Sequence, residues 1–221
     1  MPGPLSPRDA AILGSTLGFV AGFADASTFV GADGVFCAHV TGNFVVLAAD
    51  LALHVGADEW LKLATFPIFV VAVAGSAWAY RRFHPRLGAA MARHLLALKA
   101  ALIAAAAVVG LTLPSGSSGA GRTVIVGLLV IAMGIQNAIY RLDAAPLGAM
   151  TTVMTGNVTQ LLTESILLGP KRDRAKHRLL GLILAGFTLG CACGAWGVVR
   201  FGFGVLAVPA AVVLVARSRM R

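Results

Sequence analysis

Residues 123–140 read TVIVGLLVIAMGIQNAIY, a run of 18 residues without Asp, Glu, Lys or Arg. A helix that crosses the hydrocarbon core of a bilayer needs roughly 20 mostly apolar residues, so this run predicts a membrane-spanning helix. Similar apolar segments recur along the chain, at Ala10–Val30, Val35–Val55, Leu63–Tyr80, Leu95–Leu113, Thr123–Tyr140, Met150–Leu168, Leu179–Val199 and Phe203–Ala216. They predict an all-α fold, a polytopic helical bundle embedded in a membrane.

The composition agrees with this fold class. Hydrophobic residues make up 58% of the 221 residues, charged residues 12%, and the mean hydropathy is +0.85, which is too apolar for a soluble domain. The segments leave no room for a separate soluble domain, so we treat residues 1–221 as a single integral membrane domain. The net charge of +9 lies in short clusters between apolar segments, which argues against a nucleic-acid partner.

Nothing in the sequence predicts a cofactor or a metal. Cys37, Cys191 and Cys193 lie within or beside apolar segments, and no His/Cys set has the spacing of a zinc site, so we expect packing roles for them. No nucleophile and base occur in a recognisable motif, and there is no phosphate-binding loop. We therefore expect the protein not to be an enzyme.

The two halves of the chain carry matching motifs in the same order. Gly22-Phe23-Ala24-Asp25-Ala26 corresponds to Gly134-Ile135-Gln136-Asn137-Ala138, and positions 22 and 134 are 112 residues apart. Thr41-Gly42-Asn43 corresponds to Thr155-Gly156-Asn157, where positions 41 and 155 are 114 residues apart. Because the matching pattern recurs at mid-chain, the apolar stretch that ends at Ala26 is not interpreted as a signal peptide.

Further matches support an internal duplication. In the register of the Thr-Gly-Asn motifs Asp50 corresponds to Glu164, so an acid follows each Asn by seven residues. Ala77-Trp78 and Arg82-Phe83 then match Ala195-Trp196 and Arg200-Phe201, at an offset of 118. Duplicated helical units are common in transporter folds. We predict repeat 1 at residues 10–113 and repeat 2 at residues 122–216.

These motifs resemble the YoaK-like family of bacterial membrane proteins, which is catalogued as a domain of unknown function. The resemblance covers nearly the whole chain and rests on the motifs above, on residues 34–36 leading to His39-Val40 before the first Thr-Gly-Asn, and on Met133 and Met154 before the later motifs. It implies a multi-spanning inner membrane protein. The family brings no established substrate or activity to this chain.

Two basic clusters predict the topology. The first cluster follows the third segment and consists of Arg81, Arg82, Arg86 and Arg93. The second cluster follows the sixth segment and consists of Lys171, Arg172, Arg174, Lys176 and Arg178. The positive-inside rule places both clusters in the cytoplasm, but three full crossings between them would separate them. The sixth segment and its copy, the second, are therefore expected to be re-entrant half-helices that begin at their Thr-Gly-Asn motifs. The repeats would then be inverted, whereas eight ordinary crossings would give a parallel duplication.

Polar residues inside the apolar segments are the candidate site residues, because burying ionisable groups in a membrane is costly. The candidates for solute binding are Asp25, His39, Thr41, Gly42, Asn43, Asp50, Gln136, Asn137, Thr155, Gly156, Asn157 and Glu164. We expect the two Thr-Gly-Asn motifs to approach one another near the midplane. Asp50 and Glu164 are expected to flank a polar cavity, where at least one binds a proton or a cation.

These patterns favour transport over catalysis. The predicted function is a secondary transporter of a small polar or anionic solute, since helix N-termini within the membrane favour negative charge. A channel, an intramembrane enzyme and a non-transporting assembly or signalling protein remain the alternatives. The expected location is the bacterial inner membrane, with multiple crossings, and the expected partners are the lipid bilayer, a small solute and, as one option, further copies of the chain.

Overall fold

The structure is a computed structural model that describes residues 6–53, 59–88, 90–112, 119–142, 149–171 and 173–218. Within these residues the chain is helical and contains no strand, which confirms the predicted all-α class. The helices are α1 (Pro7–Gly31), α2 (Gly42–Leu53), α3 (Glu59–Leu87), α4 (Ala90–Thr112), α5 (Ala120–Arg141), α6 (Met154–Leu168), α7 (Arg174–Phe201) and α8 (Ala207–Ser218). Short 3-10 helices follow α6 (η1, Gly169–Lys171) and α7 (η2, Gly202–Leu206).

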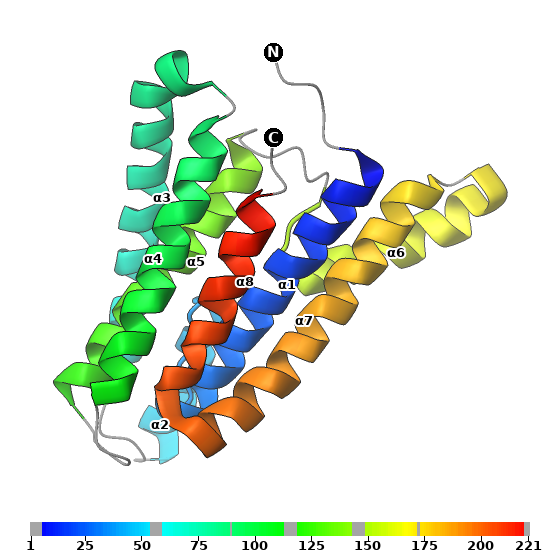
Figure 1. Cartoon of the computed structure of the whole chain (residues 1–221). Helices are drawn as coiled ribbons and strands as arrows, with labels where there is room; N and C mark the ends of the chain where they lie inside the picture. Colours follow the sequence, from blue (N-terminus) through cyan, green and yellow to red (C-terminus); the bar gives the residue numbers. More distant parts are fainter. Residues whose placement is uncertain are drawn as a thin grey trace.

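Five helical stretches of the described chain are long and apolar enough to cross a membrane. They are α1, most of α3, α4, α5 and the continuous stretch Arg174–Ser218, in which the chain reverses at η2 (Figure 1). The apolar window of α1 is 72% buried inside the protein, whereas that of α3 is only 17% buried. Hence α1 is the central helix, and α3 presents most of its surface to the surroundings.

Glycines allow α1 to pack against α7 with the backbones in direct contact. Added Cβ atoms would lie 2.2 Å from Phe187 O at Gly22, and 2.1 Å from Phe19 O at Gly190. Gly194 and Gly186 show the same proximity to the backbone of α1. Small residues spaced by four are typical of close helix contacts in membranes.

Helices α2 and α6 contain only 12 and 15 residues, too few to span a bilayer. In Figure 1, α2 lies at the end of the bundle where α1 finishes, and α6 lies at the opposite end, where α7 begins. The start of α1, the end of α3, the start of α4, the start of α7 and the end of α8 share that second end. The described residues of both basic clusters belong to these helix ends, so they lie on the same side, as the charge argument requires.

The second apolar segment differs from the expected Val35–Val55, because its first part is not helical. Residues 35–41 form an irregular connection of bends and turns, in which the backbone N–H groups of Phe36, Cys37 and Ala38 donate to side chains of Asn43 and Asp25. In this connection the side-chain acceptors replace helical carbonyls, so the chain stays non-helical until α2 begins. Residues 149–153 form the corresponding connection before α6.

The two Thr-Gly-Asn motifs do not meet. Helices α2 and α6, which carry Gly42-Asn43 and Thr155-Gly156-Asn157, share no contact with each other. Each half-helix instead packs on the helix that follows it, α2 on α3 and α6 on α7. The expectation that the motifs approach one another is therefore wrong, because each is held within its own half of the chain.

Candidate functional site

Asp25 lies near the end of α1 and organises the connection that leads to α2. Its Oδ1 accepts hydrogen bonds from the backbone N–H groups of Cys37 at 2.8 Å and Ala38 at 2.6 Å, while its Oδ2 lies 2.5 Å from His39 Nδ1. The Asp25 side chain is 4% exposed and that of His39 is 38% exposed. In this pair the carboxylate of Asp25 is buried, whereas the imidazole of His39 is partly exposed at the surface.

Asn137, a neutral amide, occupies the position in the second half of the chain that corresponds to Asp25 in the first half. Asn137 Oδ1 accepts a hydrogen bond from Thr152 Oγ1 at 2.7 Å, and its Nδ2 donates to Met133 O at 3.1 Å. Thr152 lies in the connection before α6, as Ala38 lies in the connection before α2, and positions 38 and 152 are 114 residues apart. The two halves therefore bind their connections with equivalent residues, but only the first uses a charge.

Gln136, the neighbour of Asn137, joins three elements. Its Nε2 donates to Leu17 O of α1 at 3.0 Å and to Thr151 Oγ1 at 2.8 Å, and its Oε1 accepts from Lys99 Nζ of α4. Gln136, Thr151 and Lys99 are all at most 3% exposed. A buried amide with three protein partners is satisfied, so Gln136 fixes the positions of its neighbours.

Lys99 is the functional candidate that sequence reasoning missed. It is fully buried, and within the described residues it forms no ion pair with Asp or Glu. Its Nζ donates to Gln136 Oε1, the neutral amide oxygen of α5. A signal was available, because Lys99 is the one Lys or Arg inside the apolar segment Leu95–Leu113.

We use the name central polar cluster for two hydrogen-bonded groups taken together: Asp25 with His39, and Lys99, Gln136 and Asn137 with Thr151 and Thr152. Four of the residues proposed from sequence belong to it, Asp25, His39, Gln136 and Asn137. These four residues come from α1, α5 and the connection before α2. The other three residues come from α4 and from the connection before α6. The cluster therefore lies where both broken segments meet the long helices.

Asn43 and Asn157 lie outside the cluster and stabilise their own connections. Asn43 accepts from Phe36 N at 2.7 Å and donates to Phe36 O at 2.8 Å, while Asn157 donates to Met150 O at 2.7 Å. In both cases the partner lies seven residues earlier. Asn43 also donates to Thr65 Oγ1 of α3 at 2.8 Å. Both Asn side chains are buried, so their observed contacts are structural.

The remaining residues of the two motifs lie on the outside of the half-helices. Thr41, Thr155 and Gly156 are exposed, and Gly42 is partly exposed beside the ring of Phe36. They make no contact with the central polar cluster among the contacts that the described residues form. The structure thus separates these four residues from the four proposed residues that belong to the cluster.

Asp50 and Glu164 each form an ion pair with a lysine of the following helix. Lys62 Nζ of α3 donates to Asp50 Oδ2 at 2.5 Å, and Lys176 Nζ of α7 donates to Glu164 Oε1 at 2.7 Å. We call them the α2 pair and the α6 pair. Positions 62 and 176 are 114 residues apart, as are positions 50 and 164, so acid and lysine both recur in the same register.

The two pairs differ in burial. Lys62 is 3% exposed, whereas Lys176 is 32% exposed, so the α2 pair is the more enclosed of the two. Glu164 also accepts from Gln160 Nε2 at 2.8 Å, and the hydrogen bonds from Lys176 and Gln160 lower the pKa of the Glu164 carboxyl. Both acids therefore have basic partners and lie at opposite ends of the bundle rather than side by side (Figure 1).

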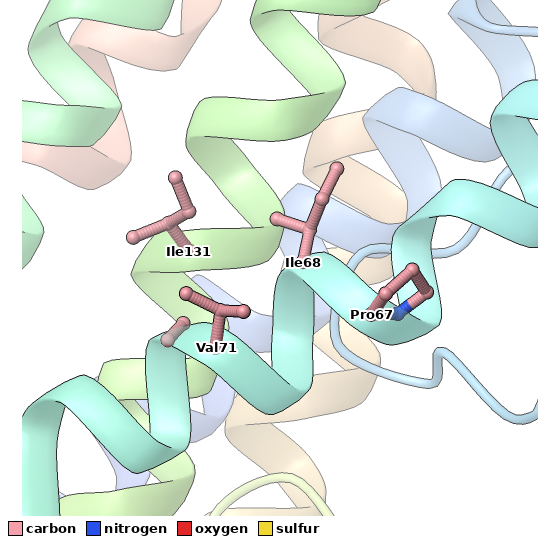
Figure 2. A pocket seen from close by; sticks show the side chains of 5 residues that line it. Pro67, Ile68, Val71 and Ile131 are labelled. Carbon is pink, nitrogen blue, oxygen red and sulfur yellow. The ribbon is translucent and has the colours of Figure 1, made fainter.

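A hollow on the described surface between two of the long helices is apolar. It has a volume of about 420 Å³ and lies between α3 and α5, lined by Pro67, Ile68, Val71, Ala72 and Ile131. Figure 2 shows Ile68 and Val71 of α3 facing the same hollow as Ile131 of α5. A surface without polar groups suits an acyl chain better than a polar solute, so we do not place the solute site there.

Among the described residues no three His, Cys, Asp or Glu side chains gather as ligands for a metal ion.

Comparisons with known proteins identify the family but no relative of known activity. No curated protein and no solved structure matches the chain. The family described as "Protein of unknown function (DUF1275)" matches residues 13–217, nearly the whole chain, and this agrees with the resemblance carried by the motifs. This protein is therefore a member of the DUF1275 family.

Proposed function

We propose that this protein is a secondary transporter of the bacterial inner membrane, which moves a small polar or anionic solute by alternating access. The observation that carries the proposal is the pair of half-helices at opposite ends of the bundle. Each is joined to the next helix by an acid–lysine pair in the same sequence register. Equivalent contacts at two ends suit a mechanism in which one end opens while the other stays closed.

The contacts also support the proposed inverted duplication. Under exchange of the halves, α1 corresponds to α5, α3 to α7 and α4 to α8. The packing of α1 on α7 then corresponds to that of α5 on α3, and the packing of α4 on α5 corresponds to that of α8 on α1. The Asn43–Phe36 and Asn157–Met150 hydrogen bonds follow the same exchange. Such symmetry is what a pseudo-two-fold axis between two repeats would produce.

The position of the central polar cluster supports a solute site between the repeats. Buried polar and ionisable groups are costly in a membrane, and in transporters they commonly mark the solute or ion pathway. The cluster draws on both proposed repeats: Asp25, His39 and Lys99 from the first, and Gln136, Asn137, Thr151 and Thr152 from the second. A rocking motion of one repeat against the other would change the access to such a site.

Uptake by proteoliposomes tests the proposal. We expect saturable uptake of at least one solute from a panel of labelled formate, acetate, phosphate, glycine and glycerol. Lys62→Gln and Lys176→Gln should each reduce the maximal rate at least tenfold, because each breaks one pair, whereas the exposed Lys171→Gln serves as the control. Single-channel currents, or flux that never saturates, would contradict a carrier.

A further inference from the structure

Lys99 is the strongest candidate for a site that the proposed function has not yet used. It lies near the middle of α4, nine residues after the first residue of the helix, which is about 14 Å along the axis. Its side chain is fully buried. In a bilayer that depth is close to the centre of the hydrocarbon core, where an ionised lysine is least favourable.

The surroundings of Lys99 do not neutralise its charge. An ammonium carries three N–H donors, and the described residues offer one hydrogen-bond acceptor, the neutral Oε1 of Gln136. The nearby Leu96, Ala100 and Ile103 of the same helix are completely buried. The other polar groups around Gln136 are the hydroxyl of Thr151 and the carbonyl of Leu17, neither of which carries a charge.

The other lysines near the two ends provide a comparison within the same protein. Lys62 lies 2.5 Å from Asp50 and Lys176 lies 2.7 Å from Glu164, so each buried or half-buried lysine there has a carboxylate partner. Lys99 is more buried than either and has none among the described residues. A buried cation is stabilised by an opposite charge at hydrogen-bond distance. The site therefore lacks the negative charge that would complement it.

We infer that Lys99, with Gln136 and Thr151, binds a small anion, and that the anion is the solute. This inference rests on the proposed transport function. The anion accepts hydrogen bonds from the Lys99 ammonium and replaces the Gln136 Oε1 contact, while Thr151 can donate its hydroxyl proton. Lys99, Gln136 and Thr151 are each at most 3% exposed, so the anion reaches them when one end of the bundle opens, and compact anions such as chloride, nitrate or formate are the ones to test first.

The inference is tested by anion-dependent thermal stability of the whole protein in detergent micelles. Sodium chloride, nitrate, formate, acetate and phosphate are titrated at constant ionic strength against sodium gluconate, whose anion is too large for the site. A ligand that binds only the folded state raises the unfolding temperature with a saturable dependence on its concentration. We expect this for at least one of the compact anions with the unmodified chain.

Variants then locate the site. Lys99→Met retains the length of the side chain, and because it removes a buried charge it should fold, but it should lose the saturable stabilisation. Gln136→Glu supplies an internal carboxylate beside Lys99 and should raise the half-saturating anion concentration at least tenfold. The exposed Lys171→Gln is the control and should retain the effect. Stabilisation that is unchanged in Lys99→Met, or no anion more effective than gluconate, would overturn the inference.

The experiment separates this inference from the proposed function, because it requires no flux. Binding of an anion that depends on Lys99, together with an absence of uptake of that same anion by proteoliposomes, would contradict transport and leave the anion site in place. Saturable uptake that is unchanged in Lys99→Met would contradict the anion site and leave transport in place.

Discussion

At the scale of single residues, the close contact between α1 and α7 depends on glycines that have no space for a side chain. A Cβ at Gly190 would lie 2.1 Å from Phe19 O, which belongs to the backbone and has little freedom to move. We predict that Gly190→Ala lowers the free energy of unfolding by about 1–3 kcal/mol through overpacking. The measurement is the unfolding midpoint of the purified protein.

Gly181 of α7 is the matched control for this substitution. A Cβ there would have no neighbour within 4 Å, so Gly181→Ala should be neutral or stabilise the helix by up to about 1 kcal/mol. Equal changes in the free energy of unfolding for the two alanine variants would show that the contact between α1 and α7 does not cause the destabilisation by Gly190→Ala.

The two asparagines of the Thr-Gly-Asn motifs make different numbers of contacts and should differ in their effect on stability. Asn43 forms hydrogen bonds with the N–H and the carbonyl of Phe36 and with Thr65, while Asn157 bonds the carbonyl of Met150. Each buried group that loses its partner costs about 1–3 kcal/mol. We predict that Asn43→Ala destabilises the protein more than Asn157→Ala does, as measured by thermal unfolding. A larger loss for Asn157→Ala would contradict the role assigned to Asn43.

At the scale of elements, the ion pair with Lys176 holds α6 to α7, and its contribution depends on pH. The pKa of Glu164 is lowered in the folded protein, so the folded value lies below the unfolded one, about 4.3. The stabilisation is therefore fully present above the unfolded value and is lost as the pH falls through the folded value. We predict that hydrogen-exchange protection of α6 decreases in that acidic range, relative to α1.

Glu164→Gln is the control for the pH dependence of α6. The amide does not titrate, so protection of α6 in this variant should start lower and stay constant over the same range. An equal acid-induced loss of protection in the variant would assign the effect to another group.

The helices could be predicted from sequence largely because apolar length is a strong signal. The segments expected at Thr123–Tyr140 and Leu179–Val199 lie within α5 and α7, and the short α2 and α6 agree with the charge argument that the sixth segment does not cross. The expected third segment, Leu63–Tyr80, was shorter than α3, which continues to Leu87 past Pro85. Hydropathy does not report such an extension, because the last turns of α3 are polar.

The contacts of the site could be predicted only in part. The duplication indicated Asp25, Gln136 and Asn137, and these belong to the central polar cluster. Periodicity gave no indication that Lys62 and Lys176 pair with the two acids, since each partner lies 12 residues away across a turn of the chain. Lys99 was overlooked because its segment is strongly apolar, although a lone lysine in such a segment is itself a signal.

At the scale of the whole molecule, alternating access requires that the central polar cluster is open to one side of the membrane at a time. The α2 pair and the α6 pair lie at opposite ends, and the end with the basic clusters is expected to face the cytoplasm (Figure 1). Breaking the α2 pair should therefore favour opening toward the outside, and breaking the α6 pair should favour opening toward the inside.

The most direct test is the accessibility of single cysteines to a membrane-impermeant maleimide added to one side of oriented vesicles. Ala38→Cys and Thr152→Cys, both at the connections of the cluster and both buried, are introduced after Cys37, Cys191 and Cys193 have been replaced by Ala. In the Lys62→Gln background we expect faster labelling from the outside, and in the Lys176→Gln background faster labelling from the inside. Equal labelling from both sides in both backgrounds would contradict alternating access.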